Sequence, residues 1–295
     1  MILPMGALAR LAVLAALAVQ SSAPAPLQVS HRARALAPGE AVLVEVRARD
    51  VIDDVEAEWL GQRVVFSLVD ENTWQGVAAI DLAAKPGPHA MTVRARTPNG
   101  TLVRQSYPLI VAGRTFPVRK LSVEAKYAEP SPDALVRIER ELRTVEGIFA
   151  RPPSPRTWTA PFAAPVPGVA TSSFGRRSIV NGEPRSPHSG MDFQAANGTP
   201  VEAPNRGTVV LATDLYFAGQ VVIIDHGASV FSYLAHLSEI GVKAGDVVAR
   251  GQRVGLSGAT GRVTGPHLHW TLRIGKARVD PLSLIYVTKK SGDRR

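Results

Sequence analysis

Two histidines separated by a single residue, His267 and His269, have the spacing in this chain that most directly suggests chemistry. They follow a Gly- and Pro-rich loop at 261–266 and begin a run of aromatic and β-branched residues that favours a strand. Because successive side chains of a strand point to opposite faces, residues two apart share a face, and both imidazoles should face one space. The pair predicts a metal site or a proton-transfer site, although two surface histidines would give the same pattern.

Three further residues, His188, Asp192 and His236, enlarge the set of candidate site residues. With the His-x-His pair they supply four imidazoles and one carboxylate, whereas a hydrolytic zinc site needs three protein ligands and keeps a fourth position for water. The remaining histidines could move protons or stabilise an oxyanion, which hydrolysis also requires. The chain has no cysteine, so any metal must rest on His, Asp or Glu. His226 lies in a Gly-flanked turn, and we expect it to be structural.

Length and composition predict a mainly β protein of roughly two domains. The chain has 295 residues, of which 45% are hydrophobic and 20% are charged, and its 23 prolines and 25 glycines favour short strands and turns. The net charge is +9, but aromatic residues make up only 6%, so we expect no nucleic acid; an anionic polymer or a membrane surface suits the charge better. No segment has the spacing of a phosphate loop or a dinucleotide fingerprint, so we expect no nucleotide.

Residues 1–25 predict a secretory signal peptide. Residues 7–19 are apolar apart from Arg10, and the core at 11–19 is too short to span a bilayer of about 30 Å. Small residues follow, although prolines among them leave the cut site uncertain. We therefore expect an exported protein, periplasmic or associated with the cell envelope, with an uncleaved N-terminal anchor as the alternative.

Residues 28–125 predict an antiparallel β-sandwich of the immunoglobulin type. Short strand-like runs alternate with turn sequences rich in Pro, Gly, Asn and Asp. The clearest runs are 41–46, 63–68, 91–95 and 109–111. Because no cluster of His, Asp and Glu occurs here, this domain would be a spacer, a regulatory module or a wall-targeting module.

A helix and a Pro-rich linker at 130–157 separate this domain from a second one at 158–287. Ser131 is the predicted cap of the helix, a proline follows it, and apolar residues then recur at helical spacing on one face. That face consists of Leu135, Ile138, Leu142, Val145 and Ile148. The second domain has the pattern of a compact antiparallel β domain, with runs at 208–212, 221–225 and 230–234, and residues 288–295 form a basic tail.

Residues from about 171 to 284 resemble the lysostaphin-like (LytM-type) zinc metallopeptidases, which cut the peptide part of bacterial peptidoglycan. The motifs, in the family's order, are Phe174-Gly175-Arg176, His188-x-x-x-Asp192, Gly198-Thr199-Pro200-Val201, Asp225-His226-Gly227, Tyr233-Leu234-Ala235-His236-Leu237 and Thr264-Gly265-Pro266-His267-Leu268-His269. The resemblance implies that His188, Asp192 and His269 bind one zinc ion (Zn2+) and that His236 and His267 are unliganded catalytic histidines. The first domain resembles the immunoglobulin-like domain that precedes the peptidase domain in some exported members.

The activity that this resemblance implies is hydrolysis of cross-links or stem peptides in peptidoglycan. Zinc would activate a water for attack on the scissile carbonyl, while His236 and His267 orient the water and stabilise the tetrahedral intermediate. The alternative is a catalytically silent wall-binding regulator that activates a separate hydrolase, although such relatives usually lack one or more of the five residues. A phosphocarrier of related β topology is disfavoured by the export signal and the complete ligand set.

The sequence leaves the surroundings of the site open. Phe174, Gly175, Asn181 and Tyr216 could line a substrate groove. The first domain or the Pro-rich linker could lie across that groove and keep the enzyme inactive until a regulatory partner moves it. The oligomeric state and the bond that is cut stay undetermined.

Overall fold

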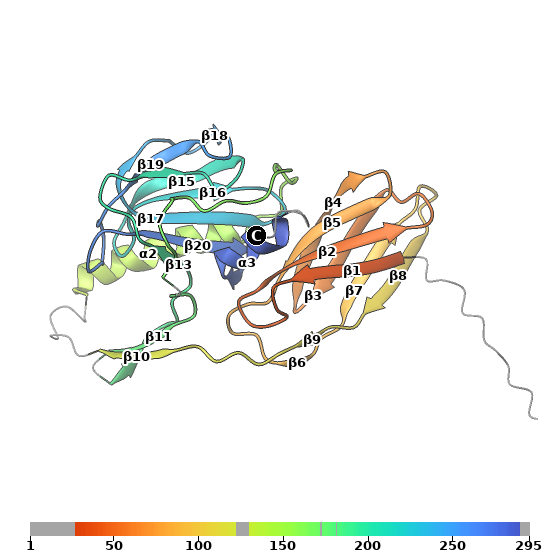
Figure 1. Ribbon diagram of the computed structural model, residues 1–295, viewed down its shortest axis with the longest axis horizontal. Coiled ribbons are helices and arrows are strands. Elements are labelled where there is room, and N and C mark those ends of the chain that lie inside the picture. The colour runs from red at the N-terminus through yellow and green to blue at the C-terminus, as the bar shows by residue number, and fades with distance from the viewer. Residues whose placement is uncertain (1–26, 122–129, 172, 181, 290–295) are drawn as a thin grey trace, which may run out of the picture.

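Two β-rich domains lie side by side along the long axis of the molecule (Figure 1). This computed structural model describes residues 27–121, 130–171, 173–180 and 182–289. The chain is mainly β, as the sequence predicts. The predicted signal peptide and most of the basic tail lie outside the described residues. Within the described ranges, no helix is long and apolar enough to cross a membrane.

The N-terminal domain is a seven-stranded antiparallel sheet with the order β1-β2-β5-β4-β3-β7-β8. Its strands are β1 Leu27–Ala33, β2 Ala41–Ala48, β3 Asp54–Trp59, β4 Gln62–Asp70, β5 Thr73–Ala79, β7 Met91–Arg96 and β8 Leu102–Tyr107. A short pair, β6 Gly87–Pro88 and β9 Ile110–Val111, accompanies it.

Alternation of side chains builds the core of this domain. Met91, Val93 and Ala95 of β7 are buried, while the intervening residues face outward more fully. Trp59 is buried in the same core and donates its indole N–H to the carbonyl of His89 at 2.9 Å. The predicted strands are therefore confirmed, whereas the assignment of the domain to the immunoglobulin type stays a prediction.

The C-terminal domain contains a nine-stranded sheet whose main path is β13-β20-β17-β16-β15-β18. Its strands are β13 Met191–Phe193, β14 Pro200–Glu202, β15 Gly207–Leu215, β16 Gly219–Asp225, β17 Val230–Ile240, β18 Val247–Val248, β19 Arg253–Ser257, β20 Leu268–Ile274 and β21 Ala277–Val279. The long strands β17 and β20 pair antiparallel at the centre, and their buried apolar residues form a continuous core. These central strands position the chemistry, because the candidate site lies on them and on β13.

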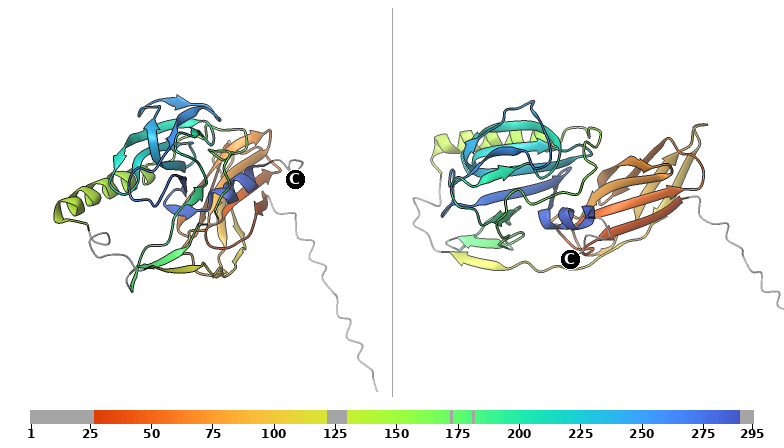
Figure 2. Two further views of the ribbon diagram at one scale, coloured as in Figure 1. Left: turned by 60° about the vertical axis from the view of Figure 1, so that its left-hand side comes forward. Right: turned by 45° about the horizontal axis from the view of Figure 1, so that its top comes forward.

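The predicted helix is α2, Pro132–Phe149, and its cap is confirmed. The hydroxyl of Ser131 accepts from the backbone N–H of Ala134 at 3.3 Å. The predicted apolar face is only partly buried: Ile138 and Ile148 are buried, but Leu135 and Leu142 are 52% and 55% exposed. The reason is placement, because the N-terminal end of α2 projects beyond the sheet while its C-terminal end packs on it (Figure 2).

A small three-stranded sheet connects the two halves of the chain. Strand β10, Val118–Leu121, pairs parallel with β11, Arg177–Val180, and β11 pairs with β12, Glu183–Pro184. The segment that leaves the first domain therefore adds a strand next to the C-terminal domain. The residue-level domain boundaries stay predictions.

The two domains also share a buried interface. Helix α3, Pro281–Thr288, begins at the cap Asp280 and packs against β2. Arg34 bridges Glu40 of the first domain and Asp280 of the second, at 2.7 and 2.5 Å. Asp81 and Arg278 form a second pair across the interface at 2.7 Å. An apolar cluster surrounds these ion pairs, and its buried members are Ala41, Leu43, Val77, Ala79, Trp158, Phe162, Val230, Leu272, Ile274, Ala277, Val279, Leu284 and Val287.

Candidate metal centre and groove

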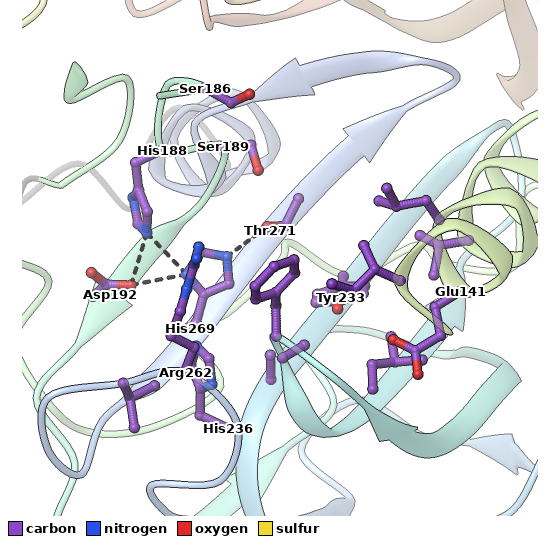
Figure 3. Close-up of a pocket in the computed structure, with 18 of the residues that line it drawn as sticks. Glu141, Ser186, His188, Ser189, Asp192, Tyr233, His236, Arg262, His269 and Thr271 are labelled. Carbon is purple, nitrogen blue, oxygen red and sulfur yellow. Dashed lines mark hydrogen bonds and ion pairs between the residues drawn. The ribbon is translucent and has the colours of Figure 1, made fainter. Parts of the chain in front are cut away.

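Three side chains that are distant in sequence converge on one point, as Figure 3 shows. Asp192 on β13 lies opposite His269 on β20 in the antiparallel register, and His188 approaches from the segment before β13. The Oδ1 of Asp192 lies 2.9 Å from His269 Nδ1 and 3.2 Å from His188 Nε2, and the two nitrogens are 3.1 Å apart. The residues that the resemblance implies as ligands thus form a compact triangle.

This triangle has the size and chemistry of a three-ligand metal site. Ligand atoms about 2.0–2.1 Å from a tetrahedral zinc ion are about 3.3 Å apart, close to the observed separations. His188 Nδ1 lies 3.1 Å from the carbonyl of Ser173, which can only accept, so Nδ1 carries a proton and, in the neutral ring, Nε2 presents a lone pair. A lone pair facing a carboxylate at 3.2 Å is unfavourable without a cation between them. The residues present therefore fit a bound metal ion.

Contacts behind the triangle fix the orientation of the rings. His269 Nε2 lies 2.8 Å from the hydroxyl of Thr271, which occupies the same face of β20 two residues on. Gly190 is required between His188 and Asp192, because a Cβ there would lie 2.6 Å from His269 Nε2 and 2.7 Å from the Thr271 hydroxyl. The His188-x-x-x-Asp192 motif thus contains a position that must stay small.

The other two predicted histidines lie beside the triangle. The rings of His236 and His267 are 4.9 Å apart, and His267 Nε2 is 3.7 Å from Asp192 Oδ1. Both donate from Nδ1 to a backbone carbonyl, His236 to Thr260 and His267 to Gly265, each at 2.9 Å. In the neutral ring, each Nε2 is then left with a lone pair. His267 and His269 line the same pocket, as their spacing predicts.

A β-bulge determines the orientation of His236. The pairing of β17 with β16 shifts register between Val222↔Leu234 and Gln220↔Leu237, so one extra residue lies in β17. His236 has φ 64°, a left-handed conformation that non-glycine residues rarely adopt, and its N–H donates to the carbonyl of Ala218 at 2.9 Å. Strained backbone of this kind is typical of functional positions.

Burial and hydrogen bonding set the charges of the site. Burial lowers the pKa of His236 to about 4 and also lowers the pKa of His269. Burial alone would raise the pKa of Asp192, but the rings of His188 and His269 beside it outweigh this effect, and the pKa falls below its usual range. At neutral pH Asp192 is therefore an anionic carboxylate and His236 and His269 are neutral rings, which is the state that binds a cation.

A groove of about 620 Å³ contains all five residues. His269, Thr271 and Arg273 line it from one face of β20, and α2 forms a second wall. The residues that α2 contributes are Ile138, Glu141, Leu142, Val145 and Phe149. Among the described residues, none of those lining the groove belongs to the N-terminal domain or to 151–157, so the wall comes from the helix rather than from the Pro-rich segment.

The described residues that the sequence predicts to line the groove do not line it. Phe174 is buried against Phe116, with ring centres 6.2 Å apart. Gly175 leaves space for the ring of Phe116, which a Cβ at this position would meet. Tyr216 is not among the lining residues; its N–H donates to Glu141 at 2.8 Å, and its neighbour Phe217 lines the groove instead. Asn181 lies outside the described residues. This prediction was wrong for Phe174 and Tyr216, because core packing and a turn determine their positions.

His226 is structural, as predicted. It is fully buried and bonds to the carbonyl of Arg206 at 2.8 Å and to the hydroxyl of Ser232 at 2.9 Å. The sequence reasoning missed the α2 wall and Arg262, which also lines the groove. The apolar face of the predicted helix was the feature of the sequence that could have indicated the groove wall, but such a face usually packs in a core.

Fold and site together define a class of protein: a β-rich chain with a compact His, Asp, His group that fits a metal ion and two further histidines beside it. The sequence pattern of Peptidase family M23 matches residues 186–281. A crystal structure of a putative peptidase M23 from Pseudomonas aeruginosa is 34% identical, with a TM-score of 0.66, and the match covers 84% of this chain and 94% of that one. This chain belongs to peptidase family M23.

Curated relatives match over a shorter stretch. Peptidoglycan DD-endopeptidase ShyA of Vibrio cholerae is 52% identical over 87 residues, which are 30% of this chain and 20% of that protein. DD-carboxypeptidase/endopeptidase Mpg of Neisseria meningitidis is 39% identical over 101 residues, 34% of this chain and 23% of that protein. The matched part thus spans less than a quarter of the length of these relatives.

Proposed function

We propose that the protein is an exported zinc metalloendopeptidase that hydrolyses peptide bonds of bacterial peptidoglycan. The observation that carries this proposal is the triangle of His188, Asp192 and His269 with His236 and His267 beside it in an open groove. Membership of family M23 and the names of the curated relatives support the substrate, and the DD-endopeptidases among them favour a D,D cross-link.

In this proposal the site residues have two roles, metal binding and proton transfer. His188 Nε2, Asp192 Oδ1 and His269 Nδ1 would hold the zinc ion, which when bound acts as a Lewis acid toward water and the scissile carbonyl. The lone pair on His236 Nε2 can accept a proton from the attacking water, because a neutral ring is the stable form at neutral pH. His267 can orient the water and, when protonated, donate to the developing oxyanion.

Export rests on the apolar segment at 7–19 and the small residues after it. Mass spectrometry of the N-terminus of protein from the cell envelope tests it. A mature chain beginning after the small residues supports cleavage. A full-length chain held in the membrane fraction supports the anchor, and a full-length chain in the cytoplasm contradicts export.

Replacing His267 by Ala separates hydrolysis from metal binding. We expect His267→Ala to retain about one zinc per chain and to lose hydrolysis of purified wall fragments, since the ring is not a proposed ligand. His188→Ala, in contrast, should lose both. Mass spectrometry of the new termini identifies the bond. Full activity of His267→Ala would contradict its role, and a wild-type protein that binds wall fragments without cutting them would favour the silent regulator.

A further inference from the structure

The loop before His267 is pressed against the turn between β15 and β16. A Cβ on Gly261 would lie 2.4 Å from the backbone N of Gly219, and one on Gly219 would lie 2.6 Å from that of Gly261, so only two glycines permit this approach. Arg262 N–H donates to the carbonyl of Phe217 at 2.9 Å, and Gln220 N–H donates to the Thr260 hydroxyl at 2.9 Å. The backbone around Arg262 is therefore fixed by contacts that do not involve its side chain.

The guanidinium of Arg262 lies over the ring of Phe217, with its Cζ 4.2 Å from the ring centre. Both residues line the groove, and Figure 3 places Arg262 on the same side of the pocket as His236 and His269. The connection to His236 is direct, because Thr260 in the same loop accepts the hydrogen bond from His236 Nδ1. The loop that carries the Arg262 guanidinium is therefore also hydrogen-bonded to His236, a proposed catalytic histidine.

The charge of Arg262 has no protein partner among the described residues. Its guanidinium forms no ion pair or hydrogen bond there, whereas Arg273, the other arginine of the groove, donates to the carbonyl of Lys276 at 2.8 Å. The two carboxylates that line the groove are engaged elsewhere: Asp192 with histidines, and Glu141 with Arg137 at 2.6 Å. Burial and the nearby charge of Arg185 lower the pKa of Arg262, so a second positive charge from another segment lies close to this guanidinium.

We propose that Arg262 binds a free carboxylate of the substrate peptide near the bond that is cut, so that the groove selects carboxylate-bearing peptides over their carboxamides. This inference rests on the proposed function. Contact with the Phe217 ring holds the guanidinium in the groove, and its N–H groups can then form a bidentate pair with a carboxylate. The backbone N–H groups of Arg262 and Gln220 already hold the loop in place through their hydrogen bonds. The charged side chain of Arg262 is therefore not needed to hold the loop.

The test compares two substrates and four zinc-loaded proteins. The substrates are a cross-linked wall peptide with free carboxylates and the same peptide with carboxamides; the proteins are the wild type, Arg262→Gln, Arg262→Lys and Arg253→Gln. Arg253 is an exposed residue of β19 outside the groove and provides the matched loss of charge. Zinc content and Tm of each variant show whether the fold is retained.

We expect Arg262→Gln to reduce kcat/KM for the carboxylate peptide about 10- to 100-fold, mainly through KM, with little change for the carboxamide. Arg262→Lys should fall between, because it keeps the charge and loses the plane. Arg253→Gln should behave as wild type. Equal losses on both substrates would show a structural role and overturn the proposal, and so would the absence of any loss.

Calorimetric binding of the same peptides keeps this test separate from the proposed function. A wild-type protein that cuts neither peptide refutes the endopeptidase, but a carboxylate preference in binding that Arg262→Gln abolishes still supports the role of Arg262. Equal binding of the two peptides by wild type, or binding of neither, overturns that role whether or not the protein is an enzyme.

Discussion

Glu40 and Asp280 at the domain interface are paired with guanidinium groups, whereas Asp192 in the groove faces imidazoles. Arg34 contacts both interface carboxylates, and Arg114 reaches Glu40 at 2.7 Å, so each negative charge meets a permanent positive charge. Asp192 instead lies beside imidazole rings, including that of His269 at 2.9 Å, which carry no permanent charge. The interface carboxylates are thus neutralised by fixed positive charges of the protein, whereas the half-buried carboxylate of Asp192 belongs to a His, Asp, His group that fits a bound cation.

The largest expected effect comes from removing the charge of Asp192. Asp192→Asn should lower metal affinity and hydrolysis by more than the roughly 10- to 100-fold that loss of an outer partner costs. The metal-free protein should also lose some stability, because His188 and His269 lower the pKa of Asp192 and so favour its charged form in the folded chain. Metal analysis, hydrolysis and thermal unfolding in a chelator measure these quantities. Metal content equal to wild type would remove Asp192 from the ligand set.

The corresponding change at the interface should affect stability rather than chemistry. Glu40→Ala removes the carboxylate that Arg34 and Arg114 share, and because both guanidinium groups are about one-third exposed, the loss should cost up to about 3 kcal/mol. Denaturant unfolding measures the loss, and Glu56→Ala is the control, because Glu56 is 33% exposed and surface pairs contribute about 0–1 kcal/mol. Equal losses of unfolding free energy in the two variants would mean that the interface ion pairs stabilise the protein no more than a surface pair does.

Acid should destabilise the protein through His226. Burial lowers its pKa from 6.5 to about 4, so the unfolded chain binds the proton more readily. Its contribution is present above pH 6.5 and is lost as the pH falls to about 4, with a size of about 3 kcal/mol. The difference in unfolding free energy between wild type and His226→Asn should shrink over this range. A difference independent of pH would contradict this assignment.

The smallest expected effect comes from a single methyl group. Gly190→Ala should displace His269 and Thr271 and lower metal affinity about 10- to 100-fold. Competition with a chelating dye measures that affinity. Gly147→Ala is the control, since a Cβ there meets nothing within 4 Å and α2 should gain about 0.5–1 kcal/mol. Unchanged affinity in Gly190→Ala would show that the site tolerates movement of His269.

The sequence predicted the strands and the meeting of the five site residues, but not their surroundings. Runs of β-branched residues indicate strands locally, and the motif order carries the ligand set by resemblance. The bulge at His236 has no such signal, because no glycine marks its positive φ. The groove wall formed by α2 depends on where the helix packs, so the helical spacing of Leu142 predicts its face of the helix but not its exposure at the groove. The position of Arg262 over Phe217 likewise arises from contacts between two distant loops.

The most direct test of the account is diffraction from crystals of the zinc-loaded protein at energies on both sides of the zinc absorption edge. We expect one strong anomalous peak per chain, within bonding distance of His188 Nε2, Asp192 Oδ1 and His269 Nδ1, with His236 and His267 beside it and unbound. No peak at that position, or a peak bound by His236 and His267 in place of the three proposed ligands, would contradict it.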